Sequence, residues 1–178
     1  MFSLTSKVVK KPKRHRLSER QQNIYEFLKN NSVAVLSTSS KSGRPHGTVI
    51  YFYINPSFEI FFITKDHTHK YQNIVANNQV MLTVFDAKTQ TVCQIEGTTK
   101  GVKSKAEISD IIKQIFKNSL KTTSSDTLPV SKLEGHYITL KIHPDNIKFS
   151  VYARHKPLNQ DELFESIGWY ELNSSHLP

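Results

Sequence analysis

The stretch that decides the fold is FEIFFITKDHTHKYQNIVANNQVMLTVFD, which runs from Phe58 to Asp86. Its two ends, Phe58–Ile63 and Gln79–Asp86, are rich in aromatic and β-branched residues, which is typical of buried strands. Between them, Thr68–Asn77 carries its apolar residues at helical spacing. The stretch therefore predicts a strand, a short helix and a second strand, joined by connections of only a few residues.

The same patterns continue on both sides of this stretch. Two pairs, Ser18 with Gln21 and Ser104 with Glu107, fit the capping box that begins a helix, and they predict two further helices. Residues 154–178 are weakly patterned, with one short helical turn predicted near 162–167. Runs of β-forming residues predict the remaining strands at Ser32–Ser39, His46–Ile54, Thr91–Val102, His136–Pro144 and Asn146–Ala153.

Tight turns separate most of the predicted strands. Such turns favour antiparallel pairing and a barrel over a parallel sheet with crossover helices. No GxGxxG motif follows the first strand, and no GxxxxGK[ST] motif occurs, which disfavours a Rossmann fold or a P-loop enzyme. The fold class that we expect is mainly β with flanking helices.

Length and composition indicate one globular domain. The chain has 178 residues, of which 37% are hydrophobic and 22% charged, and no apolar run approaches the roughly 20 residues of a membrane helix. We see no secretory signal, and the single cysteine, Cys93, predicts a reducing, cytoplasmic location and a small buried side chain. We expect a flexible basic tail over residues 1–17, a barrel domain over 18–153, and a C-terminal extension of that domain over 154–178.

The positive charge is concentrated at one end of the chain. The net charge is +9, and residues 1–20 hold seven Lys and Arg residues against Glu19 alone. Such a tail can contact nucleic acid or anionic lipid, but a solubilising arm is the favoured interpretation. The rest of the chain is nearly balanced, so it does not predict a folded nucleic-acid-binding face.

The segment before the predicted central helix is unusually basic, with Lys65, His67, His69 and Lys70 in six residues. A metal site is one interpretation of the H-x-H spacing, but no companion ligand motif occurs, so we predict no metal. An anion site is another, because Thr68 can cap a helix whose first turn carries a cation. A solvated turn is the third, and from these residues alone the choice stays open.

A resemblance to a known family bears on this choice. The chain segments SVAVLSTSSKSGRPHGTVIYFYI, FEIFFITKDHTHKYQNIVANNQVMLTVFD and CQIEG resemble the FMN-binding split β-barrels related to pyridoxamine 5′-phosphate oxidase. The likeness covers about Ser32–Val102. It implies a six- to seven-stranded antiparallel split barrel and a homodimer with FMN where the subunits meet. The motif positions matched in the second segment are Phe61, Phe62, Thr64, Lys70, Asn73, Ile74, Asn78 and Val80.

The resemblance also implies which residues contact the cofactor. Lys70 matches the family's phosphate-binding lysine, His69 stands where the oxidases have an arginine, and Lys65 is a candidate for the missing charge. Val92 lies near the place where a glutamine contacts the flavin ring. No catalytic side chain is assigned. The other implied contacts are the third-strand residues Ile63 and Thr64 and the second-strand backbone at Thr48, Val49, Ile50, Tyr51, Phe52 and Tyr53. From the residues alone, Val49, Tyr51 and Tyr53 fit core or dimer contacts better than a flavin wall.

The chain lacks the arginine-rich closing motif of true pyridoxamine-phosphate oxidases, so vitamin B6 oxidation is not the activity that we expect. The leading hypothesis is an FMN-dependent oxidoreductase that transfers hydride between a small substrate or NAD(P)H and the flavin. The alternative is a non-catalytic protein that binds a flavin, haem or deazaflavin on the same fold. Whether the protein is an enzyme is left open.

Overall fold

The computed structural model describes residues 17–120, 136–152 and 164–168, the last of these as backbone. None of the helices in these ranges is both long and apolar enough to cross a membrane. The described elements, in chain order, are α1 (Glu19–Asn30), β1 (Val33–Ser39), β2 (Pro45–Ile54), β3 (Ile60–Lys65), α2 (His69–Ala76), β4 (Gln79–Asp86), β5 (Thr91–Gly101), α3 (Lys105–Ser119), β6 (Tyr137–Val151) and β7 (Phe164–Gly168).

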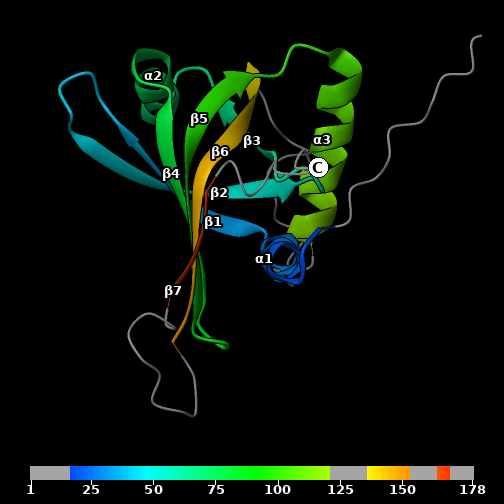
Figure 1. Ribbon diagram of the computed structural model, residues 1–178. Helices are drawn as coiled ribbons and strands as arrows, with labels where there is room; N and C mark the ends of the chain where they lie inside the picture. Colours follow the sequence, from blue (N-terminus) through cyan, green and yellow to red (C-terminus); the bar gives the residue numbers. More distant parts are fainter. Residues whose placement is uncertain (1–16, 121–135, 153–163, 169–178) are drawn as a thin grey trace, which may run out of the picture.

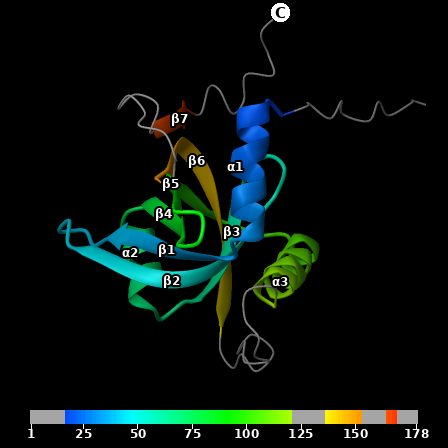
Figure 2. The same cartoon turned by 90° about the horizontal axis from the view of Figure 1, so that it is seen from below.

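The strands form one antiparallel sheet in the order β3-β2-β1-β4-β5-β6-β7. Pairing of β3 with β6 closes six of the strands into a barrel, which confirms the predicted mainly β split-barrel class. Helices α1 and α3 lie on one side of the barrel and α2 on the opposite side (Figures 1 and 2). Both α1 and α3 begin at the predicted serine caps, Ser18 and Ser104.

The barrel interior is filled by the inward faces of the strands. Strand β1, for example, alternates buried and less buried residues along its length, as expected for a strand with one face on the core. Helix α1 adds Ile24 and Leu28 to the same core, and the edge of its Phe27 ring meets Phe149 of β6 at 5.4 Å. Fully buried side chains of this core include Leu36, Phe52, Ile54, Ile60, Phe62, Leu82, Ile95, Ile142 and Ile147.

A second, smaller cluster lies outside the barrel under α3. Ile111 and Ile115 of the helix pack on Phe61, and partly buried residues of β2, β3 and the β5–α3 connection complete the contact. This packing holds α3 against the outer faces of β2 and β3. Those partly buried residues are Tyr51, Tyr53, Ile63 and Val102.

The predicted break at Pro144 is wrong, because β6 runs without interruption from Tyr137 to Val151. Pro144 pairs with Gly97 where a bulge shifts the β5–β6 register, so the missing N–H of proline is tolerated. The chains approach so closely there that a Cβ on Gly97 would lie 2.3 Å from the His143 carbonyl oxygen. Glycine is therefore required at position 97.

The helical turn predicted near residues 162–167 is also wrong, because residues 164–168 form strand β7. Strand β7 pairs with Asn146–Ser150 of β6, on the edge whose first half pairs with β3. A run of five residues does not by itself distinguish a turn of helix from an edge strand. The basic tail over residues 1–16, and residues 153–163 and 169–178, lie outside the described residues.

Candidate functional site

The hydrogen-bonded ladder between β2 and β3 is short. Strand β2 pairs with β1 over Pro45–Tyr51, but it pairs with β3 only over Phe52–Ile54. Within the described residues, positions 45–51 of β2 therefore have a free edge on the side toward β3, and positions 63–65 of β3 have one toward β2. We call these two free edges the split. Their backbone N–H and C=O groups are available to a ligand.

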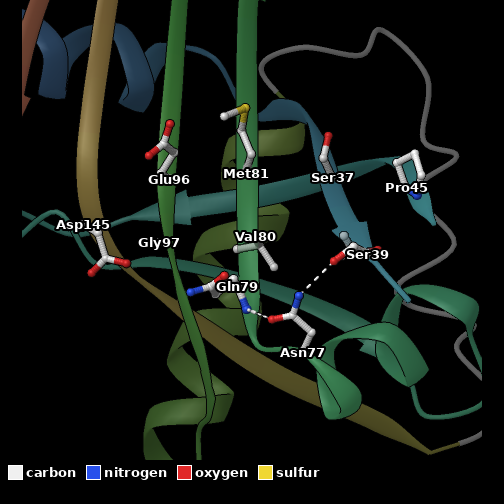
Figure 3. A pocket seen from close by; sticks show the side chains of 11 residues that line it. Ser37, Ser39, Pro45, Asn77, Gln79, Val80, Met81, Glu96, Gly97 and Asp145 are labelled. Carbon is white, nitrogen blue, oxygen red and sulfur yellow. Dashed lines mark hydrogen bonds between the residues drawn. The ribbon is translucent and has the colours of Figure 1, made fainter. Parts of the chain in front are cut away.

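Two side-chain amides fix α2 beside the split. The Asn73 Nδ2 group donates to the Thr38 hydroxyl at 3.0 Å, and the Asn77 Nδ2 group donates to the Ser39 hydroxyl at 2.9 Å. The second of these bonds is drawn in Figure 3. Both acceptors lie at the end of β1, which is paired with β2 along its whole length. The N-terminus of α2 is thereby held at a fixed place against the sheet.

The first turn of α2 has unused hydrogen-bond donors. Thr68 is the N-cap: its hydroxyl accepts from the Tyr71 N–H at 3.4 Å, and its carbonyl accepts from the Gln72 N–H at 3.0 Å. The backbone N–H groups of His69 and Lys70 have no partner in the described part of the chain. Free N–H groups at a positive helix end are the usual binding site for an anion.

Lys70 supplies a positive charge at the same helix end. Its side chain is half-buried, and burial lowers the pKa of its amino group. No carboxylate or other acceptor among the described residues pairs with it. A half-buried cation in the first turn of a helix is unfavourable, because desolvation and the helix dipole both act against its charge. An anion bound there would offset both effects.

Thr64 joins this helix end from β3. Its side chain is buried, and its hydroxyl oxygen lies 2.9 Å from that of Thr68. Ile63, the neighbouring residue on β3, turns its side chain to the opposite side and packs in the cluster under α3. Of the two predicted third-strand contacts, the structure therefore brings only the Thr64 side chain to the helix end.

Of the other basic residues of the segment, Lys65 and His67 make contacts away from the α2 N-terminus. The Lys65 amino group lies over the Tyr137 ring, 5.6 Å from its centroid. His67 is exposed in the turn and lies 3.3 Å from Asp66, whereas His69 is the first residue of α2. The H-x-H pair is thus divided between a turn and a helix, and the described residues contain no cluster of three or more metal-ligating side chains.

The side chains of β2 divide between the two faces of the sheet. Ile50 and Phe52 are buried inside the barrel, and Tyr51 and Tyr53 pack under α3, where the Tyr53 ring stacks on Phe61 at 5.9 Å. Burial raises the pKa of the Tyr53 hydroxyl. Protein packing occupies all four side chains, so a ligand in the split reaches only their backbone.

Thr48 and Val49 are the two β2 residues of the predicted wall that lie neither in the barrel core nor under α3. Thr48 pairs with buried Leu36 and is half-buried, whereas Val49 is 63% exposed. Val49 belongs to an outward-facing row across the sheet that continues through Val35, Thr83 and Gln94. Thr48 therefore faces the side of the barrel interior, and Val49 faces away from it.

Val92 is not brought to the split of its own chain. It lies on β5, paired with Phe85 of β4, and β4 and β1 separate it from β2. Three inter-strand spacings place it roughly 14 Å from β2. Together with Val49 it lies on the outer sheet face.

Sequence reasoning missed His46, which lies on β2 opposite Thr38. Its ring centroid is 6.1 Å from that of His69, and its Nδ1 atom is buried without a hydrogen-bond partner. The signal was present in the alternation of β2, because His46, Thr48 and Ile50 share one face of the strand. That face becomes part of the site only because α2 folds over it.

A groove of about 470 Å³ lies on the outer side of the sheet (Figure 3). It holds none of the predicted cofactor contacts. The exposed carboxylates Glu96 and Asp145 lie along one wall, and they would repel a phosphate. The α2 N-terminus therefore suits an anion better than this groove does. The other lining residues are Ser37, Thr38, Ser39, Pro45, Asn77, Gln79, Val80, Met81 and Gly97.

Comparison with known proteins identifies the family. The family model described as pyridoxamine 5′-phosphate oxidase matches residues 21–151. The chain belongs to the pyridoxamine 5′-phosphate oxidase-like family. The match spans every element from α1 to β6 except the first residues of α1. A search among curated protein sequences finds no match.

Solved structures with the same fold include two whose names state different ligands, FMN and haem. A pyridoxamine 5′-phosphate oxidase-related, FMN-binding protein from Nostoc punctiforme is 14% identical, with a TM-score of 0.57 over 86% of this chain and 98% of that one. General stress protein 26 from Bacillus anthracis is 21% identical, with a TM-score of 0.57 over 74% and 94%. The haem storage protein HutZ from Vibrio cholerae is 16% identical, with a TM-score of 0.54 over 69% and 88%. These likenesses show the fold and leave the ligand open.

Proposed function

We propose that this protein binds FMN and acts as a flavin-dependent oxidoreductase. One observation carries the proposal: the N-terminus of α2 presents two unpaired N–H groups and an unpaired lysine, Lys70, beside the free backbone edge of β2. The helix end suits a phosphate, and the strand edge suits the polar rim of a flat ring. FMN combines these two chemistries in one molecule.

The residues present fit the cofactor in two parts. The phosphate would be held by the His69 and Lys70 N–H groups and the Lys70 amino group, with the Thr64 and Thr68 hydroxyls within reach. The ring would lie along the backbone of β2 between Thr48 and Tyr53. The half-buried, unpaired Lys70 beside two free N–H groups favours an anion over a solvated turn, because an anion would offset the desolvation of its charge.

Bound FMN supplies hydride transfer, and the protein positions it and limits access to it. The described residues around the split offer backbone groups, hydroxyls, the Lys70 amino group and the imidazoles of His46 and His69, and we assign none of them as an acid or a base. We therefore propose that the substrate is a small molecule or NAD(P)H whose reaction needs positioning more than proton transfer. Steady oxidation of NAD(P)H by the FMN-loaded protein, with oxygen or a dye as acceptor, would support this step.

The protein is proposed to act as a homodimer through its outer sheet face. Val35, Val49 and Phe85 are 42%, 63% and 55% exposed, and we call these three residues the sheet patch. Exposed apolar groups on one uncovered sheet face are typical of a protein–protein interface. In a dimer formed there, Val92 of one protomer would approach its partner, which accounts for its distance from the split of its own chain.

The deciding experiment is an absorption spectrum of the purified protein before and after addition of FMN, followed by gel filtration. Flavin bands that remain with the protein support the proposal. If no flavin is retained, the proposal is wrong, and titration with haem and with a deazaflavin identifies which alternative holds. A haem Soret band on titration would place the protein with the haem-binding branch of the fold.

A further inference from the structure

His46 has an unusual environment for a histidine near the surface. Its side chain is half-buried, and Nδ1 is fully covered by protein with no hydrogen-bond partner. Its Nε2 has no partner in the described ranges either, but it is not among the buried atoms. One ring nitrogen is therefore sealed inside the protein, and the other is accessible.

This arrangement favours one tautomer of the ring. A buried N–H without an acceptor is rarer in proteins than a buried acceptor without a donor. A neutral imidazole carries one proton, and placing it on Nε2 leaves only an acceptor lone pair unsatisfied at Nδ1. His46 therefore presents an Nε2–H donor on its accessible side.

The His46 ring lies beside the first residue of α2. The His69 ring is its nearest aromatic neighbour, at 6.1 Å between centroids, and His69 and Lys70 carry the two unpaired backbone N–H groups. The Asn73–Thr38 bond ties the middle of α2 to β1 at the residue that is the cross-strand partner of His46. The imidazole of a strand residue and the free end of a helix are thereby placed together.

We infer that His46 is a further phosphate-binding residue, which donates from Nε2 to the same anion as the α2 N-terminus. The inference rests on the proposed function, since the anion would be the FMN phosphate. His46 and His69 together then stand in for the arginine that the sequence lacks at position 69. Two imidazoles from different elements would define the phosphate pocket, with Lys70 as its fixed charge.

The first test compares FMN with riboflavin, which lacks the phosphate. His46→Phe removes the donor and keeps a flat ring, so the FMN dissociation constant should rise about tenfold while that for riboflavin stays unchanged. His46→Gln places an amide N–H near the position of Nε2 and should restore most of the affinity. His46→Asn, whose amide reaches only the position of Nδ1, should not. Equal FMN affinity in all three variants would overturn the inference.

The second test needs no substitution and separates the inference from the proposed function. Nitrogen-15 NMR of the full-length protein should show His46 as the Nε2–H tautomer, and inorganic phosphate should shift that resonance saturably. An Nδ1–H tautomer, or no shift in phosphate, overturns the inference even if FMN binds. If the protein binds phosphate at His46 but no flavin, the inference stands and the proposed cofactor is wrong.

Discussion

Lys70 is the residue on which the proposed function most depends. Replacing it with alanine removes one charge-assisted contact worth about 1.5–3 kcal/mol. The FMN dissociation constant should therefore rise roughly ten- to a hundredfold, as measured by quenching of flavin fluorescence. Lys65→Ala is the matched control, because it removes the same charge from the same segment, but its amino group lies over the Tyr137 ring. Equal losses of FMN affinity in the two variants would mean that the total positive charge of the segment matters, and not the position of Lys70.

The lowered pKa of Lys70 sets the sign of a pH effect. Burial lowers the pKa of the free amino group, and a bound phosphate would raise it again by favouring the charged form. FMN affinity should therefore be constant below the lowered pKa and fall as pH rises through it, with a slope of at most tenfold per pH unit. Dissociation constants measured across the alkaline range should show this slope in the natural protein and not in Lys70→Ala. The same slope in both proteins would exclude Lys70 as its source.

Gly97 tests the close approach of β5 and β6. An alanine Cβ there would lie 2.3 Å from the His143 carbonyl oxygen, so backbone must move. Gly97→Ala should lower the free energy of unfolding by roughly 3 kcal/mol, measured by urea denaturation. Gly101→Ala, on the same strand with nothing within 4 Å of its Cβ, should change it by about 0.5 kcal/mol or less. Similar losses in both variants would show that strand propensity, and not the bulge, is responsible.

At the scale of single residues, the sequence predicted which side chains gather at the α2 N-terminus better than which faces of β2 stay uncovered. Lys70 and Thr64 come together because capping and strand alternation are local rules, which one sequence displays. Tyr51 and Tyr53 also alternate as predicted, but α3, about 60 residues later, covers them. No local pattern says which face of a strand a distant helix will cover. The sequence did not indicate His46 as a site residue for the same reason, because its neighbour, His69, lies on a helix that follows β3.

Among the elements, α2 connects fold and site most directly. Its N-cap, Thr68, accepts from the Tyr71 N–H and also lies 2.9 Å from the Thr64 hydroxyl. Thr68→Ala should lower the free energy of unfolding by about 1 kcal/mol and weaken FMN binding, because the first turn would fray. Thr68→Ser keeps the hydroxyl and should behave like the natural protein in both assays. If alanine is as stable as serine, the cap does not hold the site.

Most elements were predictable because each carries its own signal. The central strands alternate, and both long helices begin at serine caps. The errors lie where strand pairing determines the secondary structure. Pro144 is typical of a strand end, but β6 continues through it because Pro144 lies at the bulge opposite Gly97, where its missing N–H is tolerated. Strand β7 is too short to give a clear sequence pattern, and it is stabilised by its pairing with β6. Both errors, the strand break at Pro144 and the helical turn near residues 162–167, arise from tertiary contacts that a single sequence does not reveal.

For the whole molecule, the open question is what covers the sheet patch. A stable interface needs a central apolar contact, and Val49, at 63% exposure, is the most exposed of the three patch residues. The natural protein should sediment at twice its chain mass of 20.4 kDa. Val49→Lys would bury an unpaired charge in the interface and should shift the protein to a folded monomer.

Val75 provides the control for that substitution. It is an equally large, exposed valine, at 69%, but it lies on α2 and outside the sheet patch. Val75→Lys should therefore remain a dimer. If Val49→Lys also remains a dimer, the subunits meet through another face, and Val92 has no reason to approach a partner's flavin. If Val49→Lys is monomeric and still binds FMN, the binding site is complete within one chain. If it is monomeric and loses FMN, the site needs either the partner subunit or an undisturbed β2 at Val49, because the ring is proposed to lie along this strand.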